Sequence, residues 1–309
     1  MTPNRPLRRT LIRLAWRLIG GRRRAHFQEW FPGLDIEPAD EGTAGVIRYH
    51  GRAVAPAMAL KALTERASDE VFVIGSGPSL RDQDLSRLPD RSALLLNGAI
   101  SLIGGPVGEP LAVVMEDERF VWRHFHDIIA KVPAGAVAIL SAEVIRAICE
   151  LDGRWLADKR VVALFDARKP LRDAALSGDE LRSRNWVRLS DDGATGFSSA
   201  PDKGVFKAGS VAVSAMQFAL ACSPRRVGLL GVDISNAVAG AERFNEQAGK
   251  VAFTGVARAQ DKIVAHLSLA REIALSRGVA VTNYSPVSAL RAAGFGYDDR
   301  FALTPPPSA

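Results

Sequence analysis

The sequence has few of the residues that build disulfides and metal sites. Its 309 residues include two cysteines, Cys149 and Cys222, and five histidines, and no CxxC or HExxH motif occurs. Two cysteines in apolar surroundings exclude a disulfide framework and indicate a reducing compartment. The scattered histidines do not have the spacing of metal ligands. We therefore expect neither a disulfide-rich secreted protein nor a metal centre.

The common nucleotide-binding fingerprints are incomplete. The apolar residues 71–74 predict a buried strand, and the turn Gly75-Ser76-Gly77-Pro78-Ser79 follows, with a proline that suits the start of a helix. A dinucleotide fingerprint would have a third glycine where Leu80 stands and an acid where the next strand ends in Asn97. A Walker loop would need Gly-Lys-Ser/Thr, which does not occur. Free N–H groups at a helix start bind phosphate. The turn therefore predicts a phosphate-binding loop or, alternatively, a tight turn without a ligand.

The positive charge lies at the N-terminus. The net charge is +6, but the first 24 residues hold eight arginines and no acid, which leaves 32 basic and 34 acidic residues in the rest. The body of the protein is thus not expected to bind nucleic acid. Leucines at helical spacing share one face of the arm, with arginines on the far side: Leu7, Leu11, Leu14 and Leu18. This pattern predicts a basic amphipathic helix whose residues 5–24 lie on an anionic membrane surface. The alternative is a helix that packs its leucines on the domain.

Apolar strands alternate with helical segments from residue 71 onward. We expect strands at 71–75, 93–97, 111–115, 136–140, 161–165, 227–232 and 279–283. We expect helices at about 79–88, 118–131, 141–151, 209–222 and 258–277. The alternation predicts an α/β fold, a mostly parallel open sheet with helices on both faces. The expected organisation is an arm at 1–24, an irregular and helical lead-in at 25–70, the α/β domain at 71–300 with a lid at about 235–257, and a disordered tail at 301–309.

Ligands of open parallel sheets bind at the carboxyl ends of the strands. Beyond the 75–79 turn and Asn97, the expected strand ends carry polar residues, namely Glu116, Asp117, Asp233, Ser285 and Ser288. Asp233 closes an apolar strand, so it is either a cap for the next turn or a ligand contact. These residues form the candidate binding edge.

Four segments, in one order, resemble a known enzyme family. Residues 73–80 (Val-Ile-Gly-Ser-Gly-Pro-Ser-Leu) resemble the Gly-Asn-Gly-Pro-Ser-Leu nucleotide loop of the bacterial sialyltransferases of glycosyltransferase family 42 and of the related motility-accessory-factor and pterin-diphosphokinase-like group. Leu88-Pro89-Asp90 followed by Asn97 is similar to their Leu-Pro…Asn element. Residues 208–212 together with Leu230-Gly231-Val232-Asp233 resemble their Ser-Gly-Val…Gly-Ile-Asp element. Residues 285–290 (Ser-Pro-Val-Ser-Ala-Leu) resemble their closing Cys-Pro-Asn-Ser-Leu-Leu.

The resemblance implies a Rossmann-like variant of the GT-A fold with a lid. It implies a CMP-activated acidic sugar, such as sialic acid or Kdo, as the donor substrate, and neither a metal nor another cofactor. Asn97 is implied to lie against the donor phosphate, and Gly209 and Ser210 near the sugar carboxylate. The residues expected to bind the donor are Gly75, Ser76, Gly77, Pro78, Ser79, Asn97, Gly209, Ser210, Asp233, Ser285 and Ser288.

The sequence departs from the family pattern at the loop, the lid and the base. The loop asparagine of the family is Ser76 here, and residues 235–257 contain no tyrosine. The base of the family is a histidine, whereas an ungapped match puts Asp261 at that place, and the nearest histidine is His266. A carboxylate can serve as the base, so both residues are catalytic candidates. The alternative for Asp261 is a helical surface residue.

Together these features predict a glycosyltransferase of the bacterial cytoplasm, peripheral on the inner face of the inner membrane. It would transfer the acidic sugar to a lipid-linked glycan, such as a lipopolysaccharide core. One alternative is a Mg²⁺-dependent pyrophosphokinase of the pterin type, with Glu116 and Asp117 at the ion. The other is a nucleotide-binding protein at the membrane without catalytic activity.

Overall fold

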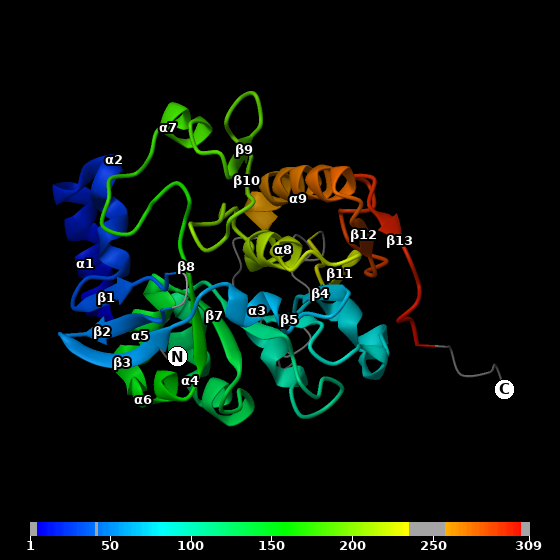
Figure 1. The fold of residues 1–309 in the computed structure, drawn as a ribbon, viewed down its shortest axis with the longest axis horizontal. Coiled ribbons are helices and arrows are strands. Elements are labelled where there is room, and N and C mark those ends of the chain that lie inside the picture. Colours follow the sequence, from blue (N-terminus) through cyan, green and yellow to red (C-terminus); the bar gives the residue numbers. More distant parts are fainter. Residues whose placement is uncertain (1–4, 41–42, 235–256, 304–309) are drawn as a thin grey trace. The chain divides into compact units, whose positions relative to one another are not determined.

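The computed structural model describes residues 5–40, 43–234 and 257–303 (Figure 1). The chain divides into two compact units. The first combines residues 1–65 with 112–207, and the second combines residues 66–111 with 208–309. The strands are mostly parallel and helices surround them, so the predicted α/β fold class is confirmed.

The first unit contains an antiparallel and a parallel set of strands. In spatial order the strands are β1 (Leu34–Glu37), β2 (Gly45–Tyr49), β3 (Arg52–Ala57), β8 (Arg160–Leu164), β7 (Val137–Ser141) and β6 (Ala112–Met115). β1 to β3 pair antiparallel, whereas β3, β8, β7 and β6 pair parallel. The helices are α1 (Leu7–Ile19), α2 (Gly21–Arg24), η1 (Ala25–Glu29), α3 (Lys61–Thr64), α4 (Glu118–Lys131), α5 (Ala142–Asp152), α6 (Arg154–Ala157) and α7 (Gly178–Arg182). A small hairpin, β9 (Val187–Leu189) with β10 (Gly196–Ser198), stands apart from this set.

The lead-in at 25–70 is more regular than the sequence predicted. Three strands and the short α3 replace the irregular chain and the long helix expected there. β2 and β3 are joined by His50 and Gly51, whose φ values are 49° and 79°. Two consecutive positive φ values give the tight hairpin turn that matches the twist of antiparallel strands. The turn brings β2 and β3 into antiparallel pairing. This local pairing outweighs the helix propensity of the alanines in β3.

The second unit has a purely parallel set of strands. In spatial order these are β5 (Ala93–Leu96), β4 (Glu70–Ile74), β11 (Arg226–Leu230), β12 (Ala280–Asn283) and β13 (Gly296–Tyr297). Helix α8 (Val211–Ala221) is buried along most of its length and packs on β4 and β5, and α9 (Gln260–Ser276) packs on α8 and β12. The 3-10 turns are η2 (Pro78–Asp82), η3 (Leu85–Arg87), η4 (Asn97–Leu102) and η6 (Ala257–Ala259).

Three expectations need correction or fall outside the description. The helix expected at 79–88 is two short 3-10 turns, because Pro78, Pro89 and the capping Asp84 limit each turn to a few residues. Phe301, at the start of the expected disordered tail, is buried with its ring 5.4 Å from Phe72 and 4.9 Å from Tyr284. Residues 235–256 of the expected lid and 304–309 of the tail lie outside the described residues. No helix in the described ranges is long and apolar enough to cross a bilayer.

Candidate active site

The polar segments named from the sequence lie in the second unit, except Glu116 and Asp117, which belong to the first. Ile74 of β4 is in register with Leu95 of β5 and with Leu230 of β11, and Leu229 is in register with Asn283. The residues that follow these strands therefore leave from the same carboxyl edge. This is the edge at which parallel sheets bind ligands.

The Gly-x-Gly turn is bonded to the chain that follows β11. The N–H of Gly75 donates to the carbonyl of Leu230 (2.9 Å), and the N–H of Gly77 donates to the carbonyl of Gly231 (2.9 Å). A Cβ on either Gly75 or Gly77 would lie closer than 3.0 Å to the Gly231 carbonyl oxygen, a separation that real Cβ atoms do not show. Both glycines are thus required by neighbouring backbone. From the sequence, both glycines were expected to make room for a ligand. The N–H groups of Gly75 and Gly77 are already used within the protein.

Asp233 lies at the centre of a buried polar cluster. Its Oδ2 accepts the backbone N–H of Ser79 (2.7 Å), and its Oδ1 accepts the hydroxyls of Ser79 (2.7 Å) and Ser285. Ser288 donates its hydroxyl to the carbonyl of Val232 (2.8 Å). We call Ser79, Asp233, Ser285 and Ser288 the Asp233 cluster; all four are buried. The carboxylate therefore joins the turn at Ser79 to Ser285 by hydrogen bonds.

More accessible residues surround the Asp233 cluster. Ser76, Asn97 and Ser210 are half-buried, and Gly209 is exposed with a φ of 87°. Ser210 caps α8, since its hydroxyl oxygen accepts the N–H of Ala212 (3.3 Å). Asn97 has a φ of 44°, a left-handed conformation that asparagine tolerates better than most residues. Its carboxamide oxygen is buried and has no hydrogen-bond donor within the described part of the chain. An unpartnered acceptor costs about 1–3 kcal/mol, which a donor on a ligand would relieve.

The two catalytic candidates differ in accessibility. Asp261 is exposed in the first turn of α9. His266 is 1% exposed, and its Nδ1 is 2.8 Å from the carbonyl of Lys262. Five residues along a helix place the two side chains on different faces. Asp261 is therefore the one that a solvent-borne acceptor can reach.

Acidic residues considered for an ion are engaged with the protein. Asp117, in the first unit, caps α4 by accepting the N–H of Arg119 (2.9 Å) and is paired with the guanidinium of Arg119. An Asp-x-Asp sequence, of the kind that can hold a metal, was expected to be absent but is present at Asp82-Gln83-Asp84. Asp84 there caps η3, because it accepts the N–H (3.2 Å) and the hydroxyl (2.6 Å) of Ser86. The described ranges contain no group of three or more metal-ligating side chains.

Sequence reasoning also missed a charged cluster in the first unit. Glu143 and Lys207 are half-buried there. Burial raises the pKa of Glu143 to about 8; the Glu29 carboxylate adds to this effect, and Lys207 opposes it. Burial alone lowers the pKa of Lys207, but the carboxylates of Glu116, Glu29 and Glu143 outweigh it and hold that pKa above its usual value. The sequence carried a signal for this cluster, since Glu143 lies three residues beyond the expected strand 136–140.

Comparisons with known proteins give structural neighbours. No protein-family model and no curated protein matches the sequence. The chain is similar to the sialyltransferase CstII from Campylobacter jejuni in complex with cytidine-5'-monophosphate, at 14% identity and a TM-score of 0.40 over 77% of this chain and 94% of that chain. It is similar to CstII in complex with CMP-3FNeuAc, at 15% sequence identity and a TM-score of 0.41, over 76% of this chain and 88% of that chain. It is also similar to the monofunctional alpha-2,3-sialyltransferase Cst-I from the same organism. The sequence identity is 14% and the TM-score 0.40, over 76% of this chain and 80% of that chain. Each of these neighbours is a sialyltransferase.

Proposed function

We propose that the protein is a glycosyltransferase that transfers an acidic sugar from its CMP derivative to a lipid-linked glycan. The Asp233 cluster is the observation that carries this proposal. Three of the four family-like segments, at Ser79, Asp233 and Ser285, meet at one carboxylate although 154 and 52 residues of chain separate them from it. Neighbouring parallel strands end at one edge, and the family-like segments at this edge are joined by hydrogen bonds through Asp233. The convergence therefore supports reading the segments as parts of one donor site.

In this proposal the Asp233 cluster holds the loop in shape, and the accessible residues around it contact the donor. Asn97 is the first contact, because its buried carboxamide oxygen has no donor within the described residues. The hydroxyl and amino groups of a CMP-sugar can supply one. Ser76, Gly209 and Ser210 are accessible to the phosphate and the sugar in this proposal.

Transfer is a direct displacement at the anomeric carbon. The acceptor oxygen bonds to that carbon, the bond from the carbon to the CMP phosphate oxygen breaks, and the acceptor proton moves to a base. Asp261 is the proposed base, because it is exposed at the start of α9 while His266 is buried. A positioned base contributes roughly 10²–10⁴-fold to such a step. The leaving CMP carries its charge on the phosphate, and donors at the site stabilise it. No step of this mechanism requires a metal ion.

The test begins with nucleotide binding by the full chain. CMP should raise the melting temperature in the presence of EDTA, because a ligand at 100 times its Kd stabilises a protein by about 2.7 kcal/mol. Asn97→Ala should weaken CMP binding by roughly ten-fold or more, because the ligand would lose a hydrogen bond to a buried group. Asn185→Ala, an exposed asparagine in the first unit, is the matched control and should leave the affinity unchanged.

Single-turnover transfer from CMP-sialic acid then separates binding from chemistry. Asp261→Asn should keep the CMP affinity and lose turnover, and His266→Ala should keep both if it folds. Full activity of Asp261→Asn would remove Asp261 as the base. Stabilisation by ATP with Mg²⁺ and not by CMP would replace the proposal with the pyrophosphokinase alternative. Binding of CMP without hydrolysis or transfer of any CMP-sugar would leave a non-catalytic nucleotide-binding protein.

A further inference from the structure

Helix α1 turns Arg9 toward the protein and its leucines toward solvent. Arg9 is fully buried, whereas Leu7, Leu11, Leu14 and Leu18 are 76%, 59%, 53% and 77% exposed. An amphipathic helix on a soluble protein shows the reverse arrangement, with apolar residues toward the core. The alternative in which the leucines pack on the domain is therefore wrong.

The inward arginine face is fixed by specific contacts within the first unit. Arg9 donates to the carbonyls of Phe31 (2.5 Å) and Gln28 (2.5 Å) and is 3.6 Å from the buried carboxylate of Glu118. Arg5 and Arg146 are paired with the same carboxylate. On this face of α1, the Trp16 ring packs 5.6 Å from the ring of Phe27 and 5.8 Å from that of Phe31. Turning the leucines inward would strip Arg9 and Glu118 of these partners, so the exposed stripe is a stable feature.

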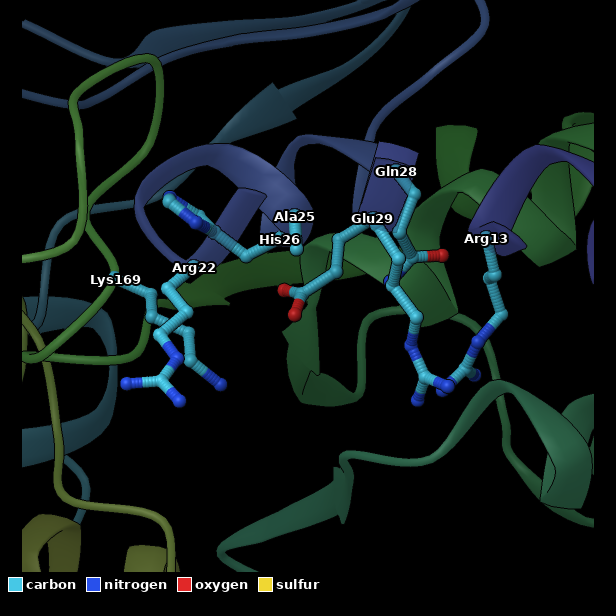
Figure 2. Close-up of a pocket in the computed structure, with 8 residues that line it drawn as sticks. Arg13, Arg22, Ala25, His26, Gln28, Glu29 and Lys169 are labelled. Atoms are coloured by element: carbon cyan, nitrogen blue, oxygen red, sulfur yellow. The ribbon is translucent and has the colours of Figure 1, made fainter. Parts of the chain in front are cut away.

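A cationic pocket lies beside the leucine stripe. It has a volume of about 280 Å³ and is lined by residues of the first unit: Arg13, Arg17, Arg22, Ala25, His26, Gln28, Glu29 and Lys169. Figure 2 shows Arg22 and Lys169 extending to one end of the pocket and Arg13 at the other end, with the Glu29 carboxylate between them. Four basic side chains against one acid favour an anionic ligand. Guanidinium groups suit phosphate in particular, because they donate paired hydrogen bonds to it.

The pocket and the leucine stripe border each other on α1. Arg17 directly precedes Leu18 and follows Leu14 by three residues, so it lies on the flank of the stripe. Beyond the end of α1, Arg22, Arg23 and Arg24 are exposed. An aliphatic stripe bordered by arginines complements a surface with an apolar interior and anionic phosphates at its boundary.

We propose that the first unit docks on a bilayer that contains anionic phospholipid. The four leucines enter the boundary between headgroups and acyl chains, and a headgroup phosphate occupies the pocket of Arg13, Arg17, Arg22 and Lys169. Charge complementarity selects this occupant, since Arg17, Arg22, Arg23 and Arg24 are exposed beside the stripe. The docking concerns the first unit only and holds whatever donor the second unit binds.

The experiment is co-sedimentation of the full chain with vesicles of phosphatidylcholine, with and without phosphatidylglycerol. The protein should bind the anionic vesicles, and salt should weaken that binding. The double variant Arg22→Gln with Lys169→Gln should lower the partition coefficient about thirty-fold, because each lost charge lowers it roughly five-fold. The matched control, Arg154→Gln with Arg225→Gln, removes two charges whose side chains are 91% and 81% exposed elsewhere, and should change binding little.

A second pair of variants tests the leucines. Leu11→Gln with Leu18→Gln should lower partitioning at least ten-fold, because each leucine would transfer from water into the apolar boundary. The control, Ile129→Gln with Leu275→Gln, removes side chains that are 48% and 52% exposed outside the arm. Circular dichroism verifies that each variant is folded, and the pocket variants keep the test valid if a leucine variant is not.

Three results would overturn the docking. Equal binding to neutral and anionic vesicles would show that no anionic lipid is required. A leucine variant that changes the oligomeric state in light scattering but not vesicle binding would show that a second copy covers the stripe. Pocket variants that lose affinity for inorganic phosphate yet bind vesicles like the wild type would make the pocket a site for free phosphate.

Discussion

Replacing Asp233 by alanine tests whether the buried cluster holds the nucleotide loop in place. The substitution removes the acceptor of the Ser79 N–H and of the hydroxyls of Ser79 and Ser285. The hydroxyls can rotate toward other acceptors. The N–H of Ser79 cannot, because the backbone fixes its direction, and Ser79 is 5% exposed, so water reaches it poorly.

The expected loss of stability follows from these bonds. A hydrogen bond to a charged group contributes about 1.5–3 kcal/mol, and a buried donor left without an acceptor costs about 1–3 kcal/mol. One orphaned N–H and two weakened hydroxyl contacts then give a loss of about 3–5 kcal/mol. Asp233→Asn should lose less, about 1–3 kcal/mol, because its amide oxygen still accepts one bond while its NH₂ faces a donor.

Urea unfolding measures this loss, with far-ultraviolet circular dichroism as the signal. With a slope of about 3 kcal/mol/M for a protein of this size, the midpoint for Asp233→Ala should fall by roughly 1 M or more. All five tryptophans lie in the first unit, and Asp233 lies in the second. Tryptophan fluorescence therefore reports the unfolding of the unit that the substitution does not touch, as an internal reference. Asp261→Ala, an exposed acid of the second unit, is the control and should shift the midpoint within error.

CMP affinity should follow the same ranking, because the loop is the proposed donor contact. The wild type should bind best, Asp233→Asn less well, and Asp233→Ala least. A midpoint for Asp233→Ala within 0.2 M of the wild type, a shift of roughly 0.6 kcal/mol at the slope above, would refute the idea that this carboxylate fastens the loop. Unchanged CMP binding in a destabilised Asp233→Ala would instead separate the cluster from the donor site.

Two further predictions concern the loop and the arm. Gly77→Ala should weaken CMP binding and destabilise the second unit by about 1–3 kcal/mol in urea unfolding, because its Cβ would overlap the Asp233 carboxylate and the loop would have to move. Glu118→Gln should cost about 3–5 kcal/mol, because it removes the buried carboxylate that Arg9 and Arg146 share, and Arg146 keeps only the ion pair with Glu150 among the described residues. Burial alone raises the pKa of Glu118, but the surrounding arginines outweigh burial and hold that pKa below 4.5, so its stabilisation is present above that pH and is lost as the pH falls. Acid titration followed by circular dichroism should therefore show a steeper loss of stability for the wild type than for Glu118→Gln.

The parallel core could be predicted from the sequence because its strands are apolar without interruption. β4, β5 and β11 are buried along nearly their whole length, and a short apolar run between turn residues is typical of such strands. The antiparallel strands β1 to β3 were missed, since their pairing depends on a positive φ at His50 that no periodicity reveals. Local patterns thus predict the elements that burial alone defines, and fail where the backbone conformation of a turn decides.

The candidate site was predicted by position and only partly by role. The strand ends brought Ser79, Asp233 and Ser285 together as expected, because parallel strands in register end at one edge. Their hydrogen bonds are with one another, however, and the two loop glycines make room for Gly231. A Gly-x-Gly turn indicates close approach to the backbone, and the sequence cannot distinguish an approaching phosphate from an approaching strand end.

The arm shows the same limit more sharply. Helical spacing placed the leucines of α1 on one face and the arginines on the other, and both faces are as predicted. Which face turns inward depends on what the helix meets, and that is decided by Glu118 and Glu150, more than 100 residues away in the sequence. Burying charges is costly unless each finds a partner. The inward face is therefore set by the acids that pair with the arginines, and the leucines are left exposed.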